Sequence, residues 1–115
     1  MMFYTFRDWI ASEFAKKAVE FLPIEMVILF GSTARKDDRP ESDIDLAIVA
    51  TRGLITRTTR RKLADISSEF LVEFGVLLNW ILITPDEYED RQNALVENIR
   101  KDGIVLWAKE KIQSK

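Results

Sequence analysis

The stretch that most constrains the fold is an unbroken apolar run from Met26 to Phe30, which ends at Gly31. A run of this length is typical of a strand that is buried on both faces. A polar segment with a proline follows it and reads as a surface loop. A second strand is then predicted over residues 43–50, and it opens with two aspartates. These two strands form the centre of the predicted fold.

The remaining pattern predicts helices before and after these strands. Apolar residues recur at helical spacing over residues 5–22 and 56–74, and Gly75 is placed to stop the second helix. A third helix is expected to begin at a Thr84 cap, to run to about residue 101 and to stop at Gly103. The other predicted elements are a helical turn over residues 33–36, a strand over 76–83, a short edge strand over 104–107 and a fraying tail over 109–115.

The order of these elements is helix, strand, strand, helix, strand, helix and short strand. It predicts an α+β fold, α/β-like in style, with helices packed on a small mixed β-sheet. The chain has 115 residues, which fits one domain over residues 1–115. Hydrophobic residues make up 47% of the chain, so we expect a folded core.

The composition narrows the chemistry that is open to the chain. It has no cysteine and no histidine, which excludes disulfides, thiolate zinc sites and Ser-His-Asp catalysis. Catalysis must therefore use carboxylates, hydroxyls, Lys or Arg, and a bound metal. The net charge of -2 gives no general attraction to nucleic acid, so stable nucleic-acid binding is not expected. The apolar runs are shorter than a membrane span and no signal peptide is evident, so we expect a cytoplasmic protein without a membrane partner.

Two aspartates at the start of the second strand are the first candidate site residues. Asp43 and Asp45 leave the same face of the strand, with Cα atoms about 6 to 7 Å apart. Carboxylates this close repel each other unless a cation neutralises them, and Mg²⁺ is the obvious one. Two such ions would clamp the attacking and leaving oxygens of a phosphoryl displacement. The alternative is a pair of solvated carboxylates at a strand start.

The turn before them offers the complementary half of a nucleotide site. Gly31 lets the backbone approach a phosphate closely, and the N–H groups of the following turn favour an anion. Ser32 adds a hydroxyl donor, and Arg35 is placed one helical turn further on, within reach of a phosphate oxygen. The alternative is a tight turn in which Ser32 is an ordinary cap.

Together, Gly31-Ser32 and Asp43-x-Asp45 resemble the signature of the nucleotidyltransferase superfamily that includes DNA polymerase beta and the antibiotic nucleotidyltransferases. The forms Gly-Ser-x-Ala-Arg and Ser-Asp-Ile-Asp-Leu resemble its minimal, single-domain branch. The resemblance implies the nucleotidyltransferase fold, ATP as substrate and two Mg²⁺ ions. By resemblance, Asp43 and Asp45 are catalytic and hold the metals. Gly31 and Ser32 hold the nucleotide phosphates, and Arg35 assists them.

The same resemblance implies a protein partner. Members of the minimal branch typically pair with a small helical HEPN protein. Some pairs are toxin-antitoxin modules, in which the nucleotidyltransferase adds AMP to a tyrosine of the HEPN ribonuclease. We therefore expect a Mg²⁺-dependent nucleotidyltransferase, protein adenylyltransferase-like, that transfers AMP from ATP to a hydroxyl of a HEPN-type partner and acts as its antitoxin.

One position departs from the family pattern. Active members usually carry a third acid on the next strand, and counting back from Thr84 places that position at Asn79. Asn79 cannot act as a general base, although its carbonyl oxygen can ligate a metal. It is otherwise a polar residue hydrogen-bonded to neighbouring backbone. The alternative function is therefore a catalytically degenerate module that neutralises its partner by binding alone.

Two further features fit more than one role. A basic stretch with no acid is read either as a contact for triphosphate, an acidic partner or RNA, or as a solvated face. Trp80 and Trp107 are expected in the core or an interface rather than as base-stacking platforms. An exposed apolar edge near Trp107 would mark an oligomer or partner surface, so a homo-oligomer is one expected assembly. The basic stretch consists of Arg52, Arg57, Arg60, Arg61 and Lys62.

Overall fold

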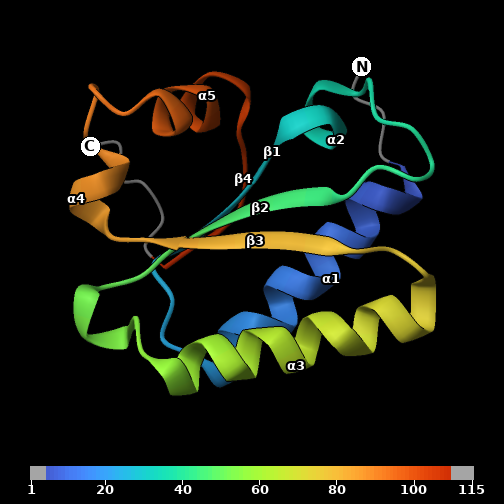
Figure 1. The fold of residues 1–115 in the computed structure, drawn as a ribbon, viewed down its shortest axis with the longest axis horizontal. Helices are drawn as coiled ribbons and strands as arrows, with labels where there is room; N and C mark the ends of the chain where they lie inside the picture. Colours follow the sequence, from blue (N-terminus) through green and yellow to red (C-terminus); the bar gives the residue numbers. More distant parts are fainter. Residues whose placement is uncertain (1–4, 110–115) are drawn as a thin grey trace.

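The computed structural model describes residues 5–109 of the chain (Figure 1). Within this range the chain alternates between helices and strands. In chain order the elements are α1 (Phe6–Phe21), β1 (Met26–Phe30), α2 (Gly31–Arg35), β2 (Ile44–Val49), the 3-10 helix η1 (Arg52–Leu54), α3 (Arg57–Phe74), β3 (Leu78–Ile83), α4 (Pro85–Tyr88), α5 (Ala94–Asp102) and β4 (Ile104–Ala108).

The strands form one mixed sheet in the order β3-β2-β1-β4. β1 runs antiparallel to both β2 and β4, whereas β2 and β3 are parallel. Parallel strands need a crossover connection, and α3 provides it by carrying the chain from the end of β2 back to the start of β3. The central part of β1 is buried, as its apolar run predicts. The predicted α+β class, a small mixed sheet with helices packed on it, is confirmed.

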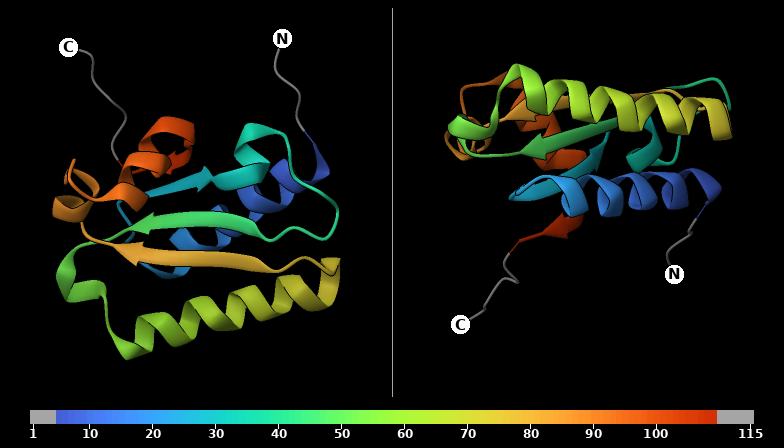
Figure 2. Two further views of the ribbon diagram at one scale, coloured as in Figure 1. Left: turned by 45° about the horizontal axis from the view of Figure 1, so that its top comes forward. Right: turned by 90° about the horizontal axis from the view of Figure 1, so that it is seen from below.

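The side chains of β2 alternate between the two faces of the sheet. Ile44, Leu46 and Ile48 belong to the core that α1 and α3 cover. Ala47 and Val49 instead pack with Ile99 of α5 on the other face. α3 and α5 lie on opposite sides of the strands (Figure 1), and α1 lies on the side of α3 (Figure 2). This period-two alternation is the predicted one, and it sends Asp45 to the α5 face.

Local signals set several helix ends as the sequence predicts. At the start of α1, Asp8 N donates to Thr5 Oγ1 at 3.0 Å, and Thr5 N donates to Asp8 Oδ2 at 2.9 Å. Thr84 and Glu87 form a second capping box at α4. Gly75 ends α3 in the left-handed region, with φ of 70°, a conformation that glycine adopts without a steric penalty.

The single helix predicted over residues 84–101 is wrong, because α4 and α5 are separate helices. Asn93 caps α5 by accepting a hydrogen bond from Val96 N at 3.1 Å. Just before it, Gln92 N donates to Asp90 Oδ1 at 2.9 Å. Short side chains that bond to nearby backbone offer it an alternative to the helix, so the helix is interrupted here.

Smaller differences concern element bounds and exposure. β3 begins at Leu78 rather than at residue 76, and α2 begins at Gly31 rather than at residue 33. Trp80 and Trp107 are half-buried against the core, which confirms their predicted place. β4 lies at the sheet edge, where Val105 is 52% exposed. Apart from Lys109, the predicted tail lies outside the described residues. Within residues 5–109, every helix falls short of what a membrane span requires.

Candidate active site

Three neighbouring strands bring the predicted site residues to one end of the sheet. The register pairs Phe30 of β1 with Asp45 of β2. It also pairs Asp45 with Asn79 of β3. Gly31 follows directly after Phe30, so the glycine turn, the aspartate and the asparagine lie side by side. The position predicted for a third acid is therefore the β3 position next to Asp45.

Gly31 is required at its position for two physical reasons. Its φ is +76°, in the left-handed region that glycine adopts readily. A Cβ atom at this residue would lie 2.3 Å from Oδ2 of Asp45, far inside van der Waals contact. The absence of a side chain at Gly31 thus makes room for the Asp45 carboxylate against the turn.

The Asn79 side chain forms a hydrogen bond with the side chain of Asp45 rather than with neighbouring backbone. Its Nδ2 donates a hydrogen bond to Asp45 Oδ1 at 3.0 Å. The amide therefore orients the carboxylate from one side, while Gly31 adjoins it from the other. Since Asn79 is neutral, the site carries two negative charges where an acid at this position would give three.

Asp43 and Ser32 flank this arrangement. Asp43 is exposed and directly precedes β2. Ser32 is half-buried and is the second residue of α2. The N-cap of α2 is Phe30, which makes no side-chain cap bond, so the reading of Ser32 as an ordinary cap is wrong. The first N–H groups of a helix have no intrahelical partner, and here they adjoin the carboxylate site.

Arg35 binds two acids in this structure. Its Nε pairs with Asp37 Oδ2 and its NH1 with Asp102 Oδ2, both at 3.3 Å. These hydrogen bonds, first to Asp37 and then to Asp102, raise the pKa of the guanidinium. Arg35 therefore links α2 to the end of α5. Its predicted phosphate contact stays a prediction.

The side chains at this end of the sheet provide oxygen ligands for a divalent cation. Among residues 5–109, no group of three or more acidic side chains lies close enough to hold a metal. The site instead offers two carboxylates, from Asp43 and Asp45, and the side-chain oxygen of Asn79. Mg²⁺ is usually held by one or two carboxylates together with water and substrate phosphates. The residues present therefore fit such an ion in the company of a nucleotide.

Arg7 was missed by sequence reasoning. It lies in the first turn of α1 and donates to the carbonyl oxygens of Pro40 and Ser42, the second of which precedes Asp43. These partners lie more than thirty residues away along the chain. No local motif marks such a contact, because it depends on the packing of α1 beside the loop.

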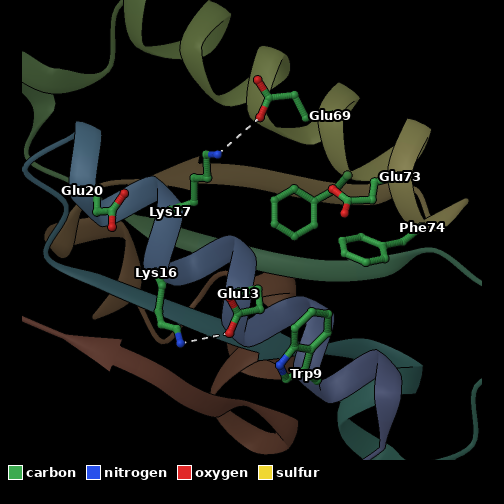
Figure 3. A pocket seen from close by; sticks show the side chains of 9 residues that line it. Trp9, Glu13, Lys16, Lys17, Glu20, Glu69, Glu73 and Phe74 are labelled. Atoms are coloured by element: carbon green, nitrogen blue, oxygen red, sulfur yellow. Dashed lines mark ion pairs between the residues drawn. The ribbon is translucent and has the colours of Figure 1, made fainter.

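Two other features lie away from this end of the sheet. The basic stretch surrounds η1 and the start of α3, beyond the far end of β2 from Asp45, so its reading as a triphosphate contact at this site is wrong. A groove of about 470 Å³ lies between α1 and α3 and is lined by Trp9, Phe70 and Phe74 among others (Figure 3). It is on the sheet face opposite to Asp45.

The mixed sheet, the glycine turn and the adjoining aspartate define the class of nucleotidyltransferase-fold enzymes. The family model "Polymerase beta, Nucleotidyltransferase" matches residues 12–112, and the chain belongs to this family. It is also 32% identical over 85 residues to a proposed protein adenylyltransferase of Methanocaldococcus jannaschii, covering 73% of this chain and 79% of the relative. The minimal-nucleotidyltransferase resemblance read from the sequence is thereby confirmed.

Solved structures give the same fold. One is a proposed nucleotidyltransferase from Sulfolobus solfataricus, with a TM-score of 0.59 and 25% identity over 90% of this chain and 81% of that one. Another is a toxin-antitoxin structure with AMP-PNP, with a TM-score of 0.59 and 18% identity over 86% of this chain and 74% of that one. At 18% identity the second likeness shows the fold alone.

Proposed function

We propose that the chain is a Mg²⁺-dependent nucleotidyltransferase that transfers AMP from ATP to a hydroxyl group of a partner protein. The observation that carries this proposal is the contact of Gly31 with Asp45 at the end of β1 and β2. It sets a phosphate-compatible turn against a carboxylate that fits a metal. Membership of the nucleotidyltransferase family supports the reaction class.

The reaction is an in-line displacement at the α-phosphorus of ATP. The acceptor oxygen forms a new bond to this phosphorus, the bond to the bridging oxygen of the β-phosphate breaks, and pyrophosphate leaves. When bound, Mg²⁺ supplies charge neutralisation for the phosphate oxygens. Asn79 cannot take the hydroxyl proton as a general base. The carboxylates of Asp43 and Asp45 are therefore the candidates for that role in this histidine-free chain.

The other residues bind and orient the nucleotide. Gly31 and Ser32 are proposed to hold the β- and γ-phosphates through backbone N–H groups and the serine hydroxyl. Arg35 assists if its guanidinium exchanges Asp37 or Asp102 for a phosphate oxygen. Asn79 fixes the orientation of Asp45 through its 3.0 Å hydrogen bond.

The partner is proposed to be a HEPN-type helical protein, and the pair a toxin-antitoxin module. One likeness supports a protein acceptor: the 32% identical relative is a proposed protein adenylyltransferase. The accepting group is proposed to be the hydroxyl of a tyrosine or of another residue. It would reach the end of the sheet where Asp43 is exposed.

Labelled ATP tests the reaction directly. The purified chain is incubated with the protein encoded beside it, MgCl₂ and ATP labelled at the α- or the γ-phosphate. Transfer of AMP labels the partner from α-labelled ATP only. Asp43→Asn and Asp45→Asn serve as folded, metal-deficient controls. Absence of α-label on the partner with folded wild-type protein would contradict the proposal.

A second candidate function is supported by Asn79. In this alternative, the site has two acidic residues where three are usual, and the chain binds nucleotide and silences its partner by contact alone. In that case Asp43→Asn abolishes binding of Mg-ATP in calorimetry but leaves neutralisation of the partner intact. Loss of both properties together favours the enzyme instead.

A further inference from the structure

The loop between α2 and β2, residues 36–42, is fastened to the first turn of α1. Arg7 makes three contacts with it. NH1 donates to the carbonyl oxygen of Pro40 at 3.2 Å, NH2 donates to that of Ser42, and Nε pairs with the Asp38 carboxylate. The side chains of Arg7 and Asp38 are each only 15% exposed. The guanidinium is thus enclosed by the loop it holds.

A second set of contacts fixes the same loop from the other side. Thr33 of α2 is buried and donates from Oγ1 to Asp38 Oδ2 at 3.2 Å. Asp38 therefore bridges α2 and α1 through one carboxylate. Lys36 pairs with Asp8, which forms the capping box of α1 together with Thr5. The loop is held at its start, middle and end, although it contains no regular structure.

The contact with Ser42 bears directly on Asp43. A peptide unit is planar, so the carbonyl oxygen of Ser42 and the N and Cα atoms of Asp43 move as one rigid group. Holding that oxygen fixes the point from which the Asp43 side chain departs. On the other side of Asp43, Ile44 N donates to Leu77 O at 3.0 Å. Asp43 is therefore fixed at both neighbours, by Arg7 and by Leu77, which directly precedes β3.

We propose that Arg7 is a positioning residue for the metal site, which holds Asp43 at the distance from Asp45 that a shared cation requires. This rests on the proposed metal role of the two aspartates. Arg7 fits because its planar fork reaches two carbonyl oxygens and a carboxylate at once, which a lysine cannot do. The orientation of a metal ligand by its neighbours is known to affect metal affinity strongly.

If Arg7 acted only through its charge, its removal would have the opposite effect on cation binding. A guanidinium near two carboxylates repels a cation, so its removal should strengthen cation binding. If Arg7 acts by positioning Asp43, its removal weakens binding instead. The sign of the change therefore distinguishes the two effects.

The test is a titration of the full chain with MnCl₂ alone, in which free Mn²⁺ is measured by electron paramagnetic resonance. We expect Arg7→Gln to weaken Mn²⁺ binding about tenfold and Asp43→Asn to weaken it at least as much. Lys36→Met is the matched control, because it removes an ion pair from the same turn of α1 without touching the carbonyl of Ser42. It should bind Mn²⁺ as the wild type does. Arg7→Lys keeps the charge but not the fork, and it decides the question if Arg7→Gln does not fold.

The outcomes separate this inference from the function on which it rests. Unchanged or tighter Mn²⁺ binding by the folded Arg7 variants, with a loss in Asp43→Asn, overturns the positioning role and leaves the metal site standing. An equal loss in Lys36→Met also overturns it, because the effect is then general loosening. Unchanged binding in Asp43→Asn overturns the metal role itself.

Discussion

At the residue scale, the site depends on a contact that only glycine permits. Gly31 combines a left-handed backbone with close packing against Asp45, because a Cβ at Gly31 would lie 2.3 Å from Asp45 Oδ2. Gly75 has nearly the same φ, 70°, yet a Cβ there would meet nothing within 4 Å. Gly75 therefore has a conformational role alone, whereas Gly31 has both a conformational and a packing role.

This pair of glycines gives the first prediction. Gly75→Ala should reduce the free energy of unfolding by about 1 to 2 kcal/mol from left-handed strain alone. Gly31→Ala should reduce the free energy of unfolding by at least the same amount. It should also weaken binding of Mg-ATP by about tenfold or more, because the added methyl group displaces Asp45. Urea denaturation and calorimetry measure the two effects. Equal nucleotide affinity in both variants would contradict the role given to Gly31.

The second prediction concerns the charge of the site. Asn79→Asp adds a third carboxylate beside Asp45. Without metal, the like charges should destabilise the fold, and with metal the extra ligand should tighten Mg²⁺ binding by about tenfold, or about 1.4 kcal/mol. Thermal unfolding with and without MgCl₂ measures both. If MgCl₂ raises the melting temperature of Asn79→Asp no more than that of the wild type, the predicted gain in Mg²⁺ binding is ruled out.

The third prediction follows from the buried carboxylate of Asp8. Burial raises its pKa, but the hydrogen bonds from Lys36 and Thr5 lower it by more, so the net pKa lies below the ordinary value. A lowered pKa means that Asp8 stabilises the fold above its unfolded pKa of about 3.9. That stability is lost as the pH falls through the folded pKa.

Asp8→Asn should therefore be less stable than the wild type by about 1.5 to 3 kcal/mol at pH 7, the range for a hydrogen bond to a charged group. The difference should begin to shrink below about pH 4, where the Asp8 carboxyl of the unfolded chain becomes protonated, and should disappear as the pH falls through the lower folded pKa. Urea midpoints between neutral and acidic pH measure this. A difference that stays constant over the whole range excludes the assigned cause.

At the element scale, the sequence predicts the strands and most helices because each has a strong local signal. Val27 to Leu29 form an unbroken apolar core, and Thr5 with Asp8 has capping-box spacing. The alternation of β2 assigns its two faces correctly. The break between α4 and α5 was missed because Asn93 resembles an ordinary polar residue until its bond to backbone is seen.

That break provides the fourth prediction. Asn93→Ala should lower the free energy of unfolding by about 0.5 to 2 kcal/mol, because the first turn of α5 loses its cap. Ser68→Ala, in the exposed middle of α3, should be neutral or slightly stabilising. Urea denaturation compares them. If the two variants unfold alike, Asn93 does not act as a cap.

The candidate site was only partly predictable from the sequence. Gly31, Asp45 and Asn79 were identified individually, and the registers of β1, β2 and β3 place them together. The hydrogen bond between Asn79 and Asp45 and the reach of Arg7 to Ser42 were not predictable. Both are tertiary contacts that depend on strand register and helix packing, which no local pattern encodes.

At the scale of the whole molecule, one end of the sheet carries the candidate chemistry. The loop over residues 36–42, the first turn of α1 and the start of β3 meet there. The groove between α1 and α3 (Figure 3) belongs to the other face of the sheet, which is the face opposite to Asp45. We therefore expect the proposed protein acceptor to approach the exposed end of the sheet beside Asp43.

The measurement that tests the account most directly is the intact mass of the neighbouring gene product after co-expression with this chain. With the wild type, we predict that the partner gains the mass of one AMP group on a hydroxyl side chain. With Asp45→Asn, folded and expressed to the same level, the partner should keep its unmodified mass. An unmodified partner in complex with the wild-type chain would contradict nucleotidyl transfer and leave binding as the function.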